Sequence, residues 1–120
     1  MRQQSTGDVD PAAQALAVRL GGLPSQTVPG FDNREFDAIS EEFIAQTTSS
    51  QSAVTRPNNF LTMARKAQIR ATLRAAKQED KIAYFEFTAG RPHPEVVACI
   101  SRNALRLGAV CLIFPEEDEP

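Results

Sequence analysis

Four basic residues in the middle of the chain carry the clearest chemical signal. They are Lys66, Arg70, Arg74 and Lys77. On a helix, at 100° per residue, their side chains fall within an arc of about 80°. Such a positive stripe suits the phosphates of a nucleic acid or an acidic protein partner, whereas base stacking would need aromatic residues that this segment lacks apart from Phe60. The alternative is a helix face that is solvated or paired with acidic residues elsewhere.

The loop that follows residue 87 is a second candidate, for an anion site. Arg91 and His93 precede an expected helix N-terminus, whose free N–H groups favour negative charge. The opposing interpretation is a rigid turn, because two prolines remove N–H donors and Arg91 can pair with Glu86 or Glu95.

Glu86 is the exception within an otherwise apolar segment at 82–87. A carboxylate that is buried there needs a cationic partner. Arg91 or Arg102 can supply that charge without any catalytic role.

The sequence contains none of the standard catalytic or cofactor motifs. It lacks the phosphate-binding and dinucleotide-binding glycine loops, the His-Glu-x-x-His motif and the Cys-x-x-Cys motif. One histidine and two cysteines argue against a tetrahedral metal site, and no serine or cysteine is spaced to use His93 as a base. We therefore expect no catalytic residue, no metal and no cofactor. Cys99 and Cys111 are expected to stay free, because packed layers would hold their backbones about 10 Å apart.

The charge of the chain is unevenly distributed. The 120 residues carry a net charge of −2, which predicts neither a nucleic-acid-binding protein nor an acidic disordered one. Residues 56–81, however, hold seven basic and two acidic side chains between two acidic segments. This basic segment is the first clue to a partner.

Residues 1–30 are expected to form a flexible N-terminal segment with one short helix at about 10–20. Asp10 can cap its N-terminus and Gly21 its C-terminus. A helix this short is marginal alone in water. Its apolar residues Leu16 and Leu20 must therefore dock on their own domain or on a protein partner.

Two longer helices are predicted at the start of a single domain that spans 31–114. One covers 32–48, where Phe36, Ile39 and Phe43 share a face. The other covers about 58–78 and has Asn58 or Asn59 available as its N-cap.

The remainder predicts a strand at 81–88, a helix at 94–108 and a strand at 109–114 that is covered on both faces. The fold class is therefore α+β, with a mainly helical N-terminal part followed by a β-α-β unit that has a small parallel sheet. Two strands leave open edges, so we expect the sheet to be completed by helix cover or by homo-oligomerisation. Residues 115–120 form an acidic tail.

These features predict a small non-catalytic adaptor that acts through protein–protein interaction. The first alternative is a nucleic-acid-binding accessory protein that uses the basic face of helix 58–78. The second is an anion- or nucleotide-binding domain, or a small enzyme, at the 88–94 loop. The N-terminus does not resemble a secretory signal, and the longest apolar run, 109–114, is too short to span a bilayer. We therefore expect a cytoplasmic protein without membrane contact.

Overall fold

The computed structural model describes residues 10–115 of the chain. In chain order the elements are α1 (Pro11–Leu20), β1 (Leu23–Thr27), β2 (Glu35–Ile39), β3 (Phe43–Thr48), α2 (Ser52–Thr55), α3 (Pro57–Phe60), α4 (Met63–Gln78), β4 (Ile82–Phe87), α5 (Pro94–Leu107) and β5 (Cys111–Phe114).

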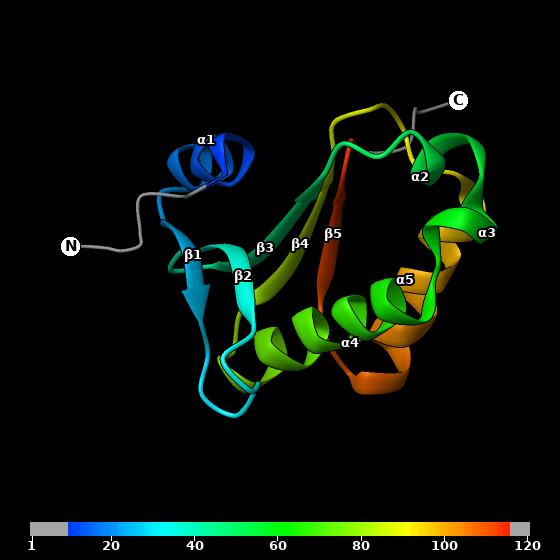
Figure 1. Ribbon diagram of the computed structural model, residues 1–120. Coiled ribbons are helices and arrows are strands. Elements are labelled where there is room, and N and C mark those ends of the chain that lie inside the picture. Colours follow the sequence, from blue (N-terminus) through cyan, green and yellow to red (C-terminus); the bar gives the residue numbers. More distant parts are fainter. Residues whose placement is uncertain (1–9, 116–120) are drawn as a thin grey trace.

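The strands of the described residues form one mixed sheet in the order β1-β2-β3-β4-β5. β1, β2 and β3 are antiparallel neighbours, whereas β3, β4 and β5 run parallel. Helix α1 packs on one face of the sheet, and α4 and α5 cover the other (Figure 1). The predicted α+β class is therefore confirmed.

The C-terminal β-α-β unit has the predicted form. β4 and β5 are parallel neighbours, and α5 makes the connection between them. Helix α5 begins at Pro94 after its N-cap His93, whose Nδ1 accepts the N–H of Glu95 at 3.1 Å. It ends at Leu107 and is capped by Gly108, which has a φ of 69° and so adopts the left-handed conformation that glycine allows.

The helix predicted over 32–48 is wrong, because this region forms the hairpin of β2 and β3. Phe36, Ile39 and Phe43 do recur at helical spacing, but a turn separates the last two. Within that turn the hydroxyl of Ser40 accepts the N–H of Phe43 at 3.0 Å. Since β1 is also a strand, the N-terminal part is not mainly helical. Pairing with strands distant in sequence has outweighed the local periodicity.

Helix α4 begins later than predicted. Its N-cap is Thr62, whose Oγ1 accepts the N–H of Arg65 at 3.1 Å. The two asparagines that were expected to cap this helix lie in the separate short helix α3. Leu61, with a φ of −85° and a ψ of 58°, interrupts the helical backbone between α3 and α4.

The expectation of an incomplete two-stranded sheet is also wrong. The same chain supplies three further strands, so the reason given for homo-oligomerisation no longer holds. β5 is not covered on both faces, because Leu112 and Phe114 are exposed to 43% and 48%. β5 forms one edge of the sheet and β1 the other.

Helix α1 packs on its own sheet rather than standing free for a partner. Leu16 and Ala17 are fully buried against Ala38 and Ala45, and Leu20 is partly buried beside them. From Asp10 onward, the predicted flexible segment 1–30 is thus part of the folded domain. Residues 1–9 and 116–120, including most of the expected acidic tail, lie outside the described residues. Among the helices between residues 10 and 115, none has the length and apolar character to cross a membrane.

The burial of α1 predicts unequal effects of truncating two of its apolar residues. Leu16→Ala should lower the free energy of unfolding by about 2–5 kcal/mol, because it leaves a cavity in a packed interface. Val18→Ala, at a position 76% exposed, should change it by less than about 0.5 kcal/mol. Urea unfolding of both variants measures the difference. Equal, small effects would show that α1 does not belong to the core of the domain.

Candidate active site

Strands β2 and β3 diverge after a short paired stretch. Within the described strands their register consists of Ala38 with Ala45 and Ile39 with Ile44. Beyond that point β2 continues beside β1, and β3 continues beside β4. The gap opens toward the carboxyl end of β3, which is also the carboxyl end of β4 because these strands are parallel. Ligands of open sheets commonly bind beyond this end of parallel strands.

Asp37 of β2 bridges this gap with its side chain. Its Oδ2 accepts the backbone N–H of Thr47 on β3 at 2.8 Å, in place of a regular ladder bond. Burial raises the pKa of Asp37 above its ordinary value, and the carboxylates of Asp10 and Glu35 raise it further. The Thr47 N–H and the charge of Arg65 act in the opposite direction. A carboxylate whose pKa is raised at a strand end is a candidate functional group.

Gln46 lies on β3, one position beyond the last β2–β3 pair, and is buried. Its Nε2 donates to Oγ1 of Thr72 on α4 at 3.2 Å, and that hydroxyl donates to the carbonyl of Gln68 at 2.8 Å. Within the described part of the chain, its Oε1 has no hydrogen-bond partner. An unsatisfied buried acceptor costs about 1–3 kcal/mol. This oxygen is therefore available to a proton donor or a cation.

A cavity of about 20 Å³ lies beside Gln46, between the sheet and α4, and is large enough for a water molecule. Its polar lining includes Thr48, Arg65 and Gln68. The guanidinium of Arg65 lies 4.5 Å from the centre of the Phe60 ring, and its Nη1 donates to Oε1 of Gln68 at 3.2 Å. These two contacts hold a positive charge at the wall of the cavity.

Thr47 connects this site to a second carboxylate. While its N–H donates to Asp37, its hydroxyl donates to Oε1 of Glu86 on β4. Glu86 is only 5% exposed, and its Oε2 forms an ion pair with Arg19 of α1. The partner expected from the sequence was an arginine beyond residue 90. The fold instead supplies one from the N-terminal helix, because Glu86 faces the side of the sheet on which α1 packs.

Two residues at the divergence of β2 and β3 carry oxygen atoms of the kind that hard divalent cations prefer. Asp37 offers a carboxylate and Gln46 an unpartnered amide oxygen. Mg²⁺ prefers oxygen ligands and usually keeps several water molecules. Among residues 10–115, no group of three or more His, Cys, Asp or Glu side chains could hold a metal ion.

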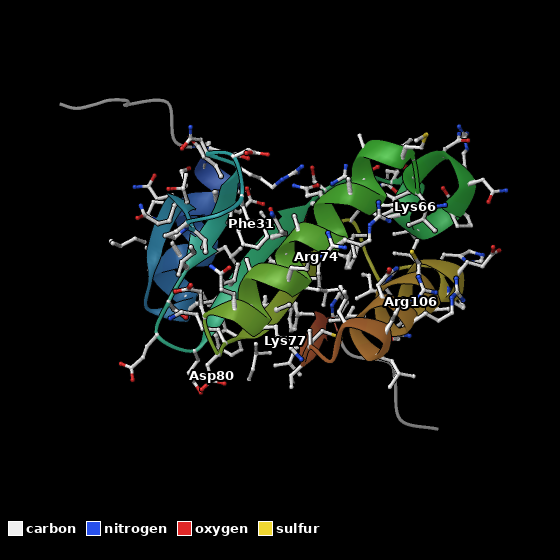
Figure 2. The ribbon with its side chains drawn as sticks, turned by 90° about the horizontal axis from the view of Figure 1, so that it is seen from below. Phe31, Lys66, Arg74, Lys77, Asp80 and Arg106 are labelled. Atoms are coloured by element: carbon white, nitrogen blue, oxygen red, sulfur yellow. The ribbon has the colours of Figure 1, made fainter. Side chains whose placement is uncertain are left out.

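The four residues of the predicted basic stripe lie outside this cavity. Lys66, Arg74 and Lys77 are exposed and extend from the outer side of α4 (Figure 2), and Arg70 is half-buried. The Nζ of Lys77 donates to the carbonyl of Gly108 at 3.4 Å, which ties α4 to the end of α5. A binding role for this stripe remains a prediction.

Part of the second predicted site, the loop with Arg91 and His93, makes contacts that stabilise the fold. His93 caps α5 through its Nδ1, which favours the rigid-turn interpretation of this loop. Arg91 lines a groove between α5 and β5, together with Pro92 and Cys111. Both cysteines are free, as predicted.

Sequence reasoning missed Asp37, Gln46 and Arg65. The first two were hidden by the incorrect helix over 32–48, which concealed the alternation of two strands. Arg65 did carry a signal, because at 100° per residue it lies on the same side of α4 as the buried Ile69 and Thr72. A charged residue within a buried helix face is a reason to expect a site.

The raised pKa of Asp37 predicts a stabilising substitution. At a pH above the folded-state pKa the ionised carboxylate destabilises the folded state, and this cost disappears as the pH falls to the unfolded-state value of 3.8. Asp37→Asn removes the charge and keeps an acceptor for the Thr47 N–H. It should raise Tm at pH 7 by on the order of a few °C, and by less near pH 4. Thermal unfolding at the two pH values measures this.

Glu41→Gln is the matched control, since Glu41 is an exposed carboxylate in the turn between β2 and β3. It should leave Tm nearly unchanged at both pH values. A lower Tm of the Asp37→Asn variant at pH 7 would contradict the assignment of an unfavourable charge to Asp37.

Comparison with known proteins identifies the family. The family model described as restriction endonuclease fold toxin 3 matches residues 3–108. No curated protein and no solved structure matches the chain significantly. The prediction of a non-catalytic adaptor acting through protein–protein interaction is therefore wrong, because this family's description denotes toxins with an endonuclease fold, which implies an enzyme. Since the match covers most of its length, the chain belongs to the restriction endonuclease fold toxin 3 family.

Proposed function

We propose that this chain is a nuclease toxin that hydrolyses phosphodiester bonds of a nucleic acid. The observation that carries the proposal is the Asp37 carboxylate at the divergence of β2 and β3, which accepts the amide N–H of Thr47, the residue after Gln46 with its unpartnered amide oxygen. The family match supports phosphodiester hydrolysis as the chemistry of this site. The nucleic acid that the stripe on α4 was expected to bind thus becomes the substrate.

Asp37 and Gln46 are the residues that would hold a divalent cation such as Mg²⁺. Protein sites for Mg²⁺ often supply only one or two oxygen ligands, and water and substrate phosphates fill the remaining positions. A cation held by Asp37 and Gln46 would act as a Lewis acid that stabilises the negative charge of the phosphate undergoing hydrolysis. The buried Oε1 of Gln46 supports this assignment, because in the described residues no protein donor satisfies it.

Arg65 is suited to bind the scissile phosphate. In hydrolysis the oxygen of water bonds to phosphorus, the bond from phosphorus to the leaving oxygen breaks, and that oxygen takes up a proton. Negative charge develops on the phosphate oxygens, and a fixed guanidinium at the cavity wall can stabilise it. The contacts of Arg65 with Phe60 and Gln68 hold it in position before substrate arrives.

Thr47 and Glu86 are positioning residues in this proposal. The Thr47 amide orients the Asp37 carboxylate, and the Glu86 carboxylate holds the Thr47 hydroxyl. The ion pair with Arg19 compensates the charge of Glu86 at its buried position. The orientation of Asp37 therefore depends on contacts that reach from β2 to α1.

Substitution of Asp37 tests the proposed activity. Asp37→Asn should lower the rate of Mg²⁺-dependent cleavage of DNA or RNA by at least about 10²-fold while the protein stays folded, because it removes the one charged ligand that the proposal gives the cation. Gel assays on both substrates measure the rate. Glu41→Gln should retain the wild-type rate. A wild-type protein that cleaves neither substrate with Mg²⁺ or Mn²⁺ would refute the proposed function.

A second experiment tests cation binding without any activity measurement. Millimolar Mg²⁺ should raise Tm of the wild-type protein, because a ligand of the folded state stabilises it. Gln46→Leu has a similar volume but no oxygen and should reduce this rise, whereas Gln46→Glu should enlarge it. An unchanged rise in the Gln46→Leu variant would exclude Gln46 as a ligand.

A further inference from the structure

A basic surface lies on the side of α4 and α5 that faces away from the sheet. We call it the two-helix basic face, and its residues are Lys66, Arg70, Arg74, Arg102 and Arg106. Figure 2 shows Lys66, Arg74 and Arg106 on this side of the molecule. The two arginines of α5 were not part of the stripe predicted from the sequence. The fold has thus widened a single positive row into a surface that spans two helices.

The first of two grooves on this face runs between α4 and α5. Its volume is about 440 Å³, and its lining includes Lys66, Arg70, Arg102 and Arg106. Glu95 is the one carboxylate among its lining residues. Four cations opposite a single anion give this groove a positive potential.

The second groove runs between α4 and the loop that precedes β2, and its volume is about 650 Å³. It adds Arg34 to Arg70 and Arg74, with Asp32 as the one carboxylate in its lining. Because Arg70 lines both grooves, the positive surface is continuous across the outer side of α4.

The cations of the two-helix basic face have no carboxylate partner within the described residues. The ion pair found between residues 10 and 115 joins Arg19 and Glu86, on the other side of the sheet. Lys77 differs from its neighbours, since its Nζ donates to the carbonyl of Gly108. We therefore leave Lys77 out of the face. Unpaired cations that line grooves attract a polyanion.

We infer that the two-helix basic face binds the phosphate backbone of a nucleic-acid duplex, away from the point of cleavage. The inference rests on the proposed function for the identity of this ligand as the substrate. Single strands are usually bound by stacking bases on aromatic rings. Phe31 is the one aromatic residue that lines the two grooves, and its ring packs edge-to-face on Phe36 at 6.0 Å. Contacts to phosphates alone suit a duplex, whose backbone carries the highest charge density.

The basic face and the candidate active site lie on two sides of α4. Arg65 lines the cavity beside Gln46, and the next residue, Lys66, lines the groove between α4 and α5. An α-helix with its side chains is about 10–12 Å across. A backbone in this groove therefore passes within about one helix diameter of the cavity. A long polymer bound in this groove can therefore also reach the candidate active site, which would retain the substrate between cleavage events.

The salt dependence of binding tests the inference. Wild-type protein in EDTA, which prevents cleavage, is titrated with a short duplex DNA at several salt concentrations. Each phosphate contact adds about 0.9 to the slope of log affinity against log salt concentration. Arg102→Gln with Arg106→Gln, and separately Arg70→Gln with Arg74→Gln, should each lower that slope by up to about 1.8. At low salt each pair should weaken binding by about tenfold or more.

The matched control introduces the same change in net charge on the opposite face of the sheet. Gln14→Glu with Ala15→Glu places two acidic residues at exposed positions of α1. This variant should keep the wild-type slope and affinity. Glu95→Gln, which removes the carboxylate from the groove between α4 and α5, should tighten duplex binding.

Three results would overturn the inference. They are equal slopes in all variants, tighter binding of single-stranded than of duplex DNA, and competition by polyglutamate as strong as that by duplex at equal charge. The last result would assign the face to an acidic protein. Salt-dependent duplex binding that these arginines control, in a protein that cleaves nothing, would support the face and refute the nuclease. Cleavage by the wild-type protein, together with salt slopes that the arginine substitutions leave unaltered, would support the nuclease and refute the basic face as a binding surface.

Discussion

The hydrogen bond from the Thr47 amide to the Asp37 carboxylate is the contact on which the candidate site depends. In a regular antiparallel ladder, a backbone carbonyl of β2 would satisfy that amide. Here a side chain reaches across instead, so the two strands can separate without leaving a buried donor unpaired. Gln46, the residue before Thr47, has the unpartnered amide oxygen of the site. The Asp37 carboxylate thus replaces one backbone carbonyl of β2 as the acceptor. This one change lets the sheet open at that end and places a carboxylate at the opening.

The groups of the site are individually unfavourable for stability. Asp37 has a raised pKa, and Gln46 has an unsatisfied oxygen. Such features cluster where a protein binds a ligand, because the ligand supplies the missing interaction. The surrounding structure compensates through the buried contacts of α1 with the sheet and through the ion pair of Glu86 with Arg19. The N-terminal helix is therefore a support for the site as well as part of the core.

The two faces of the sheet differ in charge. A net charge of −2 averages over this difference and gives no indication of it. On the side of α4 and α5, cations from separate helices line common grooves, whereas on the other side Arg19 is neutralised by Glu86. Helix α4 links the basic side to the candidate site, because Arg65 lines the cavity and Lys66 the groove. The division of charge follows from the angle of 100° between consecutive residues of a helix.

The sequence by itself determined the elements whose signals are local. Asp10, Gly21 and Gly108 marked helix ends correctly, because a cap depends on residues within one turn. The parallel β-α-β unit and the angular spread of the basic stripe were also local properties. The α+β class followed from them.

Only the tertiary structure decided what β1, β2 and β3 are, and with them the site. A strand is stabilised by partners that are distant in sequence, so Phe36, Ile39 and Phe43 gave a helical pattern while β4 fixed their region as a hairpin. Asp37, Gln46 and Arg65 come from three separate elements, and no spacing along the chain indicates that they meet. The sequence therefore indicated both ends of α1 and of α5, whose caps are local, whereas the pairing of remote strands decided which polar groups lie at the candidate site.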